Sequence, residues 1–552
     1  MHPCLNVDEI LRLLACELVG SEANATAVSL ARCCKSFEHP VLDSLWGTQD
    51  ELLPLLKSLP ADVWKVEAGQ FVSPPTAFIS SHLIPLPEKS FERIPTKDEW
   101  NRFRKYARGK RKLKVDPSED LVVSDVLFVL QLRTGNEPLL PGLEAFECGA
   151  ASEAFVPFIP LFLSPRTVEI RIRFAASAPT VMVASTIARF STLCPNIQSL
   201  ILDPLPRSQV TTEAVSEMLL ACNRGTLRVF CVNCPLTEEA RGFLHTLPKL
   251  CQLWVFAQGQ TSLPPLELPD LDMVRIEWDS GCDWLQGFCG ATIGKLKIIS
   301  FRPVPGSTQI GGFLEKFQAV ALATSLQNTL SEFKFRTSQS WNPSYSSLLI
   351  FTQMRVLEIE FSCRNPGCSS TVDDNIVTSL ARAMPKLEIL RLGKAPCSAL
   401  TGVTLTGLVA LACHCSHLSE LRIHMQAGGL GEATADTEQP RLSENAVVIP
   451  RVDCALTVLQ VGEAPIPQEA VPAVALTLLQ VFPRIANVEH VDPRWESVVE
   501  MIKLFRRIGG RIYHASKADL LYPECLLMTP CQETHSYRKS VGKRLGVTVA
   551  IL

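Results

Sequence analysis

The stretch that decides the fold is LEILRL, residues 387–392, whose apolar residues Leu387, Leu390 and Leu392 follow the spacing apolar-x-x-apolar-x-apolar. The alternation at its end is typical of a strand with one buried face, and the first leucine is expected to pack beneath that strand. The same spacing begins at eleven sites: Ile197, Leu227, Leu250, Leu271, Leu296, Leu330, Met354, Leu387, Leu418, Leu456 and Ile485.

These sites recur at an average interval of about 29 residues, the upper end of the leucine-rich-repeat period. A lone strand cannot bury its apolar face, whereas stacked units of strand and helix share one continuous core. Five sites are preceded by apolar-Pro-x-apolar, in which the proline ends the preceding helix; these begin at Cys194, Leu247, Leu268, Met384 and Phe482.

We therefore predict an α/β solenoid over residues 136–552. It is expected to be an irregular leucine-rich-repeat horseshoe, with parallel strands inside and helices outside. The repeats are expected to be irregular because the Asn or Cys that closes the turn of regular repeats is missing after each of these strands.

Composition describes an ordered chain of 552 residues, 47% hydrophobic and 20% charged, which is too long for one compact core. A formal net charge of −3 argues against a general nucleic-acid binder. The 20 cysteines and the charged amino-terminal segment predict a reducing compartment, the cytoplasm or nucleus, where cysteine acts mostly as a small buried apolar residue. The uncharged stretch 395–419 is interpreted as a repeat helix, so we expect no membrane partner.

Residues 1–48 are predicted to form a compact module of three helices. LNVDEILRLLACEL places apolar residues at helical spacing, and a second helix is expected over roughly 24–34. PVLDSLW begins a third helix with Pro40 in its first turn. In this order, with VSLARCCKSF between them, the segments resemble the F-box, and more narrowly fungal F-box proteins with irregular leucine-rich repeats. One departure is Asn6, where the F-box has the proline of its Leu-Pro start.

This resemblance implies a substrate receptor of an SCF-type cullin–RING ubiquitin ligase. The module would bind a Skp-family adaptor, and through it a cullin, while the repeats would hold an unknown protein substrate. Such a receptor is not an enzyme, because it only raises the effective concentration of a target lysine near the ubiquitin-charged enzyme. The adaptor surface and its supporting core are expected to comprise Leu5, Ile10, Leu14, Leu30, Cys34, Phe37 and Trp46.

A second interpretation is a leucine-rich-repeat scaffold with no ligase role, in which the N-terminal helices only cap the open end of the solenoid. A third, an enzyme with cysteine chemistry, has no motif in its favour. Stoichiometric binding of the adaptor discriminates between the first two interpretations.

Residues 49–135 are expected to join the module to the repeats. Prolines break up the first part, and eight Lys and Arg residues fall within 102–114. Such a run is found in nuclear-import signals and anion-binding patches. We favour an amphipathic helix in which Trp100, Phe103 and Tyr106 dock on the first repeat and the charges are solvated.

Residues between the buried positions of each strand are expected to contact the target from the concave side. The candidates are Arg228, Arg275, Glu277, Lys334, Glu358, Arg391 and Arg422. Their mixed signs argue against a simply acidic or simply basic ligand. Residues 424–450 lack apolar periodicity and are expected to form an inserted loop, either on the binding face or without a role.

The sequence gives no support for catalysis, a metal or a cofactor. CVNC (Cys231, Cys234) has metal-knuckle spacing but lacks two further ligands nearby, so core residues are expected. In CHCSH, residues 413–417, a helix cannot direct all four Cys and His side chains the same way. No GxxxxGK[ST] phosphate loop occurs.

Overall fold

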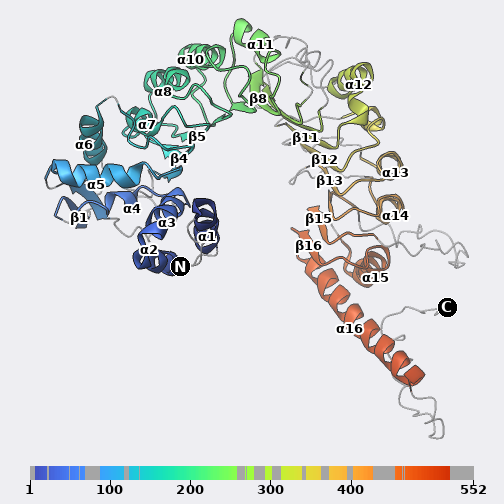
Figure 1. Cartoon of the computed structure of the whole chain (residues 1–552). Coiled ribbons are helices and arrows are strands. Elements are labelled where there is room, and N and C mark those ends of the chain that lie inside the picture. Colours follow the sequence, from blue (N-terminus) through green and yellow to red (C-terminus); the bar gives the residue numbers. More distant parts are fainter. Residues whose placement is uncertain are drawn as a thin grey trace, which may run out of the picture. The chain divides into compact units, whose positions relative to one another are not determined.

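The computed structural model divides the chain into two compact units, Met1–Ile293 and Gly294–Leu552, each an α/β assembly (Figure 1). The residues that it describes are 7–20, 24–48, 50–60, 62–68, 87–91, 93–116, 124–135, 137–257, 268, 270–278, 293–300, 312–337, 343–361, 372–393, 402–426, 454–462, 464 and 466–521. Leu5 and residues 427–450 of the expected loop lie outside these ranges.

The first unit begins with helices α1 (Asp8–Gly20), α2 (Asn24–Cys33) and α3 (Lys35–Thr48). They are followed by the short helix α4 (Leu53–Leu56) and an antiparallel pair of strands, β1 (Trp64–Ala68) and β2 (Pro87–Phe91). Helix α5 (Lys97–Ala107) starts at a capping box, in which the Thr96 side chain accepts from the Glu99 N–H and the Glu99 carboxylate accepts from the Thr96 N–H. Helix α6 (Ser124–Thr134) follows.

Seven consecutive strands then form the parallel sheet of the first unit as the structure describes it. They are β3 (Lys112–Val115), β4 (Ala145–Ala151), β5 (Glu169–Phe174), β6 (Ser199–Leu202), β7 (Val229–Val232), β8 (Gln252–Ala257) and β9 (Met273–Trp278). The helices between them are α7 (Ile159–Phe162), α8 (Thr180–Ala188), α9 (Phe190–Leu193), α10 (Gln209–Leu220) and α11 (Glu238–Leu244). Helices α8, α10 and α11 cover one face of the strands (Figure 1); we call the opposite face the free face.

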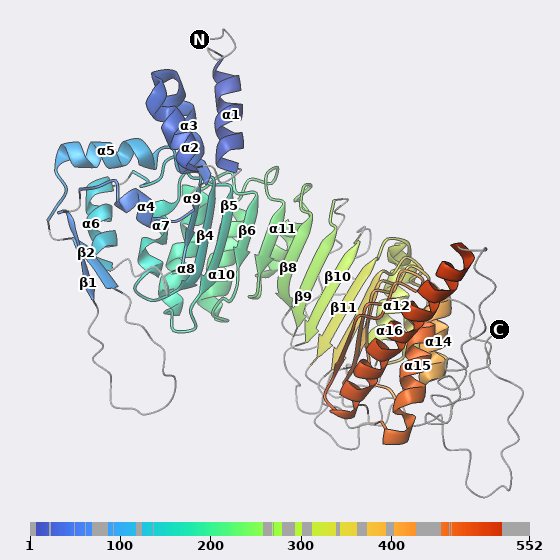
Figure 2. The same cartoon turned by 90° about the horizontal axis from the view of Figure 1, so that it is seen from below.

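The second unit repeats this arrangement with seven described strands. They are β10 (Lys295–Ser300), β11 (Glu332–Thr337), β12 (Val356–Phe361), β13 (Ile389–Leu392), β14 (Glu420–Ile423), β15 (Val458–Gly462) and β16 (Asn487–His490). Helices α12 (Phe313–Thr324), α13 (Asp374–Ala383), α14 (Leu405–His414) and α15 (Val471–Val481) lie on one face (Figure 1). Helix α16 (Arg494–Leu521) packs on α15 and β16 (Figure 2). Its residue Trp495 is fully buried.

Strand registers confirm the repeating pattern at ten of its eleven sites, because the second apolar residue of each site aligns with its counterpart, as Leu390 does with Leu357 and Leu421. The site placed at Leu296 is wrong by three residues. Leu296 aligns with Phe333, which is itself a second apolar residue, so the pattern starts at Ile293. The apolar run after Leu296 satisfies the same spacing, and only the register shows which frame is buried.

The sheet also begins earlier than the sequence indicated. Strand β3 lies within residues 49–135 and pairs with β4, which pairs with β5. In these strands the first position of the pattern is held by Lys110, Leu143 and Thr167, so two of the three sites lack the apolar residue that marks the others.

A backbone ladder joins neighbouring repeats just before the strands. The carbonyl oxygen of Gly294 accepts from the N–H groups of Ser331 and Glu332 at 2.7 and 3.0 Å, and that of Ser331 accepts from Arg355 and Val356 at the same two distances. The first unit does the same at Gln198, whose carbonyl accepts from two N–H groups of the next repeat. These hydrogen bonds satisfy backbone groups where each strand begins. The Asn that regular repeats use, and that this chain lacks, would stand at the other end, after each strand.

Candidate partner-binding surfaces

The three N-terminal helices, which lie next to one another (Figures 1 and 2), enclose a core of their own. As far as the structure describes it, this cluster draws its side chains from α1, α2 and α3 and the residue between the last two. Its buried members are Leu11, Ala15, Val19, Ala27, Phe37 and Val41, with Leu18, Leu30, Ala31, Cys34 and Leu45 packed against them. These three helices therefore share a hydrophobic core among themselves within the first unit.

The module also exposes apolar side chains. On α1, Leu13 is 70% exposed and Leu14 is 41% exposed. Val7, just before α1, and Val28, on α2, are exposed as well. On a helix, Val7, Ile10 and Leu14 fall on one flank of the buried stripe, while Leu13 lies on the far side. Leu14 and its neighbours on that flank are available for contact with a partner, and Leu13 is exposed on another side of the same helix.

The structure separates the residues that the sequence assigned to the adaptor surface. Leu14 is exposed and Ile10 is half-buried, whereas Phe37 belongs to the core and Leu30 and Cys34 support it. Leu13, Val7 and Val28 are exposed as well, although the sequence analysis did not assign them to the adaptor surface. Their helical positions, outside the buried stripe of α1 and α2, were the signal that could have found them.

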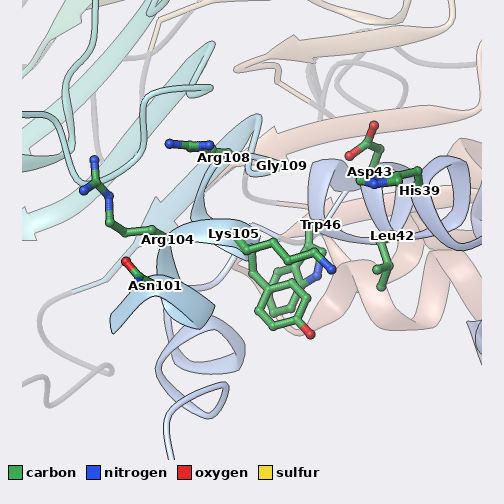
Figure 3. Close-up of a pocket in the computed structure, with 10 residues that line it drawn as sticks. His39, Leu42, Asp43, Trp46, Asn101, Arg104, Lys105, Arg108 and Gly109 are labelled. Atoms are coloured by element: carbon green, nitrogen blue, oxygen red, sulfur yellow. The ribbon is translucent and has the colours of Figure 1, made fainter. Parts of the chain in front are cut away.

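Trp46 faces the rest of the first unit. Its ring stacks on Tyr106 of α5 with the ring centroids 5.2 Å apart, and Lys105 pairs with Glu38 at 3.5 Å. A cavity of about 460 Å³ opens at this junction (Figure 3). Its walls come from α3 and from α5 with the turn after it: His39, Leu42, Asp43, Trp46, Asn101, Arg104, Lys105, Tyr106, Arg108 and Gly109.

Aromatic residues within and just before the basic segment 102–114 are buried and anchor α5. Trp100 and Phe103 of α5 are buried and stacked on each other, with their ring centroids 4.9 Å apart. Lys110 is fully buried and donates to the carbonyl of Glu51, and burial lowers the pKa of its ammonium group to about 8. Lys110, one of the eight basic residues of this segment, thus joins it to the backbone at Glu51 through a hydrogen bond.

On the free face of the second unit, predicted target residues pair with one another. Glu358 lies between Lys334 at 3.0 Å and Arg391 at 3.3 Å, and Arg391 also binds Glu420 at 2.7 Å. In the adjacent row, Glu360 binds Arg336 at 2.6 Å and Arg422 at 3.5 Å. We call these two rows the ion-pair ladder. It brings together Lys334, Glu358, Arg391 and Arg422 from strands β11 to β14.

The free face of the first unit carries a different cluster. Glu277 is only 2% exposed and binds Arg275 at 2.8 Å and Arg207 at 3.0 Å. The Arg275 guanidinium lies 3.5 Å from the Trp254 ring centroid, and that of Arg207 lies 4.1 Å from the Phe256 centroid. Burial raises the pKa of Glu277, although both arginines partly offset it. The predicted Arg228 lies apart, exposed just before β7.

In the two cysteine motifs, Cys231, Cys234 and Cys415 are buried and Cys413 is exposed. Burial raises the pKa of both Cys231 and Cys234 to about 12, so each is a thiol at neutral pH. Cys413 is exposed, whereas Cys415 is buried and directs its Sγ at the carbonyls of Ala381 and Met384. Within the described ranges, no group of three or more His, Cys, Asp or Glu is placed to hold a metal ion.

Comparisons of the sequence with protein-family models and with curated proteins found no match. Among the helices that the structure describes, none combines the length and apolar character needed to cross a bilayer.

Proposed function

We propose that this chain is the substrate receptor of an SCF-type cullin–RING ubiquitin ligase, an F-box protein with irregular leucine-rich repeats. Its N-terminal module binds a Skp-family adaptor and through it a cullin. The free face of its repeats holds a protein target. The chain performs no chemistry itself, and its contribution is to position the target.

One observation carries this proposal: the N-terminal helices have a closed core and still expose apolar side chains. A cap would use its apolar face to cover the first repeat. Here Leu11, Ala15 and Phe37 are satisfied within the module, and Leu13 and Leu14 stay on its surface. Burying two leucines in an interface stabilises it by roughly 3–6 kcal/mol before the costs of association.

The stacking of Trp46 on Tyr106 also supports a chain in which the N-terminal helices bind the adaptor and the repeats bind the target. A receptor must hold its target at a defined distance from the ligase, so its adaptor-binding module requires a rigid attachment to the repeats. Trp46, the Lys105–Glu38 pair and the buried Lys110 supply contacts that limit the motion of the linker.

Co-expression with a Skp-family adaptor tests the proposal. The full chain is expected to co-purify with the adaptor in a one-to-one complex. The double variant Leu13→Asp with Leu14→Asp is expected to lose it, because both side chains are exposed and their replacement spares the core.

A matched control changes two exposed apolar residues elsewhere in the first unit, Leu132→Asp and Val181→Asp, each 67% exposed in the original chain. This control is expected to keep the adaptor. If the folded full chain leaves the adaptor behind, the receptor function is refuted and the scaffold interpretation takes its place.

A further inference from the structure

We propose that the free face of the first unit, over strands β5 to β9, binds an extended acidic peptide segment. The inference rests on the proposed function only in identifying that segment as part of a target protein. The binding site itself follows from the arrangement of donors on this face.

Two arginines on β5 provide the first step. Arg171 and Arg173 are exposed, and their side chains make no hydrogen bond or ion pair with any residue that the structure describes, although the Asp203 carboxylate lies within electrostatic reach of Arg173. They lie two residues apart on one strand, so their side chains leave the same face about 7 Å from each other. Alternate side chains of an extended peptide have the same spacing, which matches two carboxylates to two guanidinium groups.

Buried donors on β8 and β9 provide the second step. The indole N–H of Trp254 and the Nε–H of Arg275 are buried without a hydrogen-bond partner in the described structure. An unsatisfied buried donor costs about 1–3 kcal/mol, so such groups call for an explanation. An acceptor-rich ligand would satisfy both, through its carbonyl or carboxylate oxygens.

The surface between these donors provides the third step. Register places Arg171 beside Ile201, Ile201 beside Cys231, and Cys231 beside Trp254. The path across the sheet from arginine to indole is thus apolar and about 14 Å long, since strands are spaced by about 4.8 Å. An acidic segment that lies along β5, and whose chain then turns to run across β6 and β7 with apolar residues, fits this path.

Two carboxylates limit the length of the anion. Glu147 of β4 lies opposite Arg171 in the register, and Glu169 precedes Arg171 by two residues on the same strand. They would repel a long polyanion continuing past the arginines. The face therefore fits a short acidic peptide better than a nucleic acid.

Fluorescence anisotropy with the full chain tests this inference. The probe is a fluorescein-labelled peptide in which two glutamates, separated by one alanine so that both side chains leave the same side of an extended chain, are followed by valine, alanine and phenylalanine residues. The full chain is expected to bind it, and Arg171→Glu with Arg173→Glu is expected to weaken binding at least about tenfold, through loss of two charge-assisted contacts. Trp254→Phe, which removes the indole N–H together with part of the ring on which Arg275 stacks, is expected to weaken it several-fold.

The matched control, Arg166→Glu with Arg189→Glu, changes the net charge by the same amount at exposed positions outside this face. It is expected to bind as the unaltered chain does. Equal loss in the control would show non-specific attraction, and full binding by the Arg171/Arg173 variant would place the peptide elsewhere; either outcome overturns the inference.

Two further probes define the ligand class. A peptide with glutamine in place of glutamate is expected not to bind, and a fluorescein-labelled oligothymidine is expected to bind more weakly than the acidic peptide. Tighter binding of the oligothymidine would overturn the assignment to a peptide. Because the Arg171/Arg173 variant leaves the N-terminal module intact, its co-purification with the adaptor reports separately on the receptor function.

Discussion

The free faces of the two units carry similar residues in different states. In the second unit, Glu358 and Glu360 each bind two cationic side chains, so the charges neutralise one another. In the first unit, Arg171 and Arg173 lack such partners among the described residues, and buried donors lie three and four strands away. Equivalent strand positions thus stabilise the sheet in one unit and offer contacts to a ligand in the other.

Reversing the charge at the centre of the ion-pair ladder is expected to have the largest effect. Glu358→Lys places a third cation between Lys334 and Arg391, and removes the carboxylate that both bind. We expect the free energy of unfolding to fall by about 2–4 kcal/mol, measured by urea denaturation. Arg171→Gln on the other face, which adds no carboxylate beside Glu147 and Glu169, is the control, with an expected change below about 0.5 kcal/mol. Similar losses for both would refute the contrast.

Removing one cation from the ladder is expected to have a smaller effect. Arg391→Gln leaves Glu358 with Lys334 alone and deprives Glu420 of its arginine. Since the Arg391 side chain is partly solvated, we expect a loss of about 1–2 kcal/mol in the same assay. A change no larger than that of an isolated surface arginine such as Arg189→Gln would show that the ladder adds nothing.

The Glu277 carboxylate makes the stability of the first unit depend on pH. Burial raises its pKa in the folded state above the unfolded value, so folding favours the protonated form. This stabilisation is complete below the unfolded pKa, about 4.3, and is lost as the pH rises through the folded pKa. The free energy of unfolding of the original chain, relative to Glu277→Gln, is therefore expected to decrease as pH rises.

Urea denaturation between about pH 4 and 8 measures this difference. Arg189→Gln is the control, since a guanidinium stays charged throughout this range and its difference should be flat. A difference that grows with pH for Glu277→Gln would mean that Arg275 and Arg207 outweigh the cost of burial.

Neutralising the two exposed arginines is expected to have the smallest effect on stability. Arg171→Gln with Arg173→Gln removes no hydrogen bond or ion pair made to a described residue, so the free energy of unfolding should change by less than about 0.5 kcal/mol. Urea denaturation of the double variant checks this. A loss above about 1 kcal/mol would show that the arginines serve the fold.

Much of the fold could be predicted because one face of each strand must be apolar. The period-two alternation located ten strands, and LEILRL showed the frame most clearly. Strand β3 was missed because a buried lysine, Lys110, stands where the pattern has an apolar residue. At Leu296 an apolar run fits two frames, and only pairing between strands chooses one.

Which charged side chains form ion pairs with one another could not be predicted from the sequence. Ion pairing depends on the register of strands that are some 24 to 33 residues apart in the chain, as for Lys334, Glu358 and Arg391. Arg171 and Arg173 were within reach, because the alternation of RIRF already places them together on the face opposite Ile170 and Ile172. What the sequence lacked was the information that no carboxylate among the described residues forms an ion pair with them, although Glu147 is in register with Arg171 and Asp203 lies within electrostatic reach of Arg173.

Hydrogen exchange of the full chain, alone and with a purified Skp-family adaptor, tests the central proposal most directly. We predict slower amide exchange in α1 and α2, around Leu13, Leu14 and Val28, with exchange in strands β11 to β14 unchanged. Protection confined to the N-terminal module would support a receptor that keeps its repeats free for a target. Unchanged exchange throughout the module at saturating adaptor would contradict the account and leave a repeat scaffold.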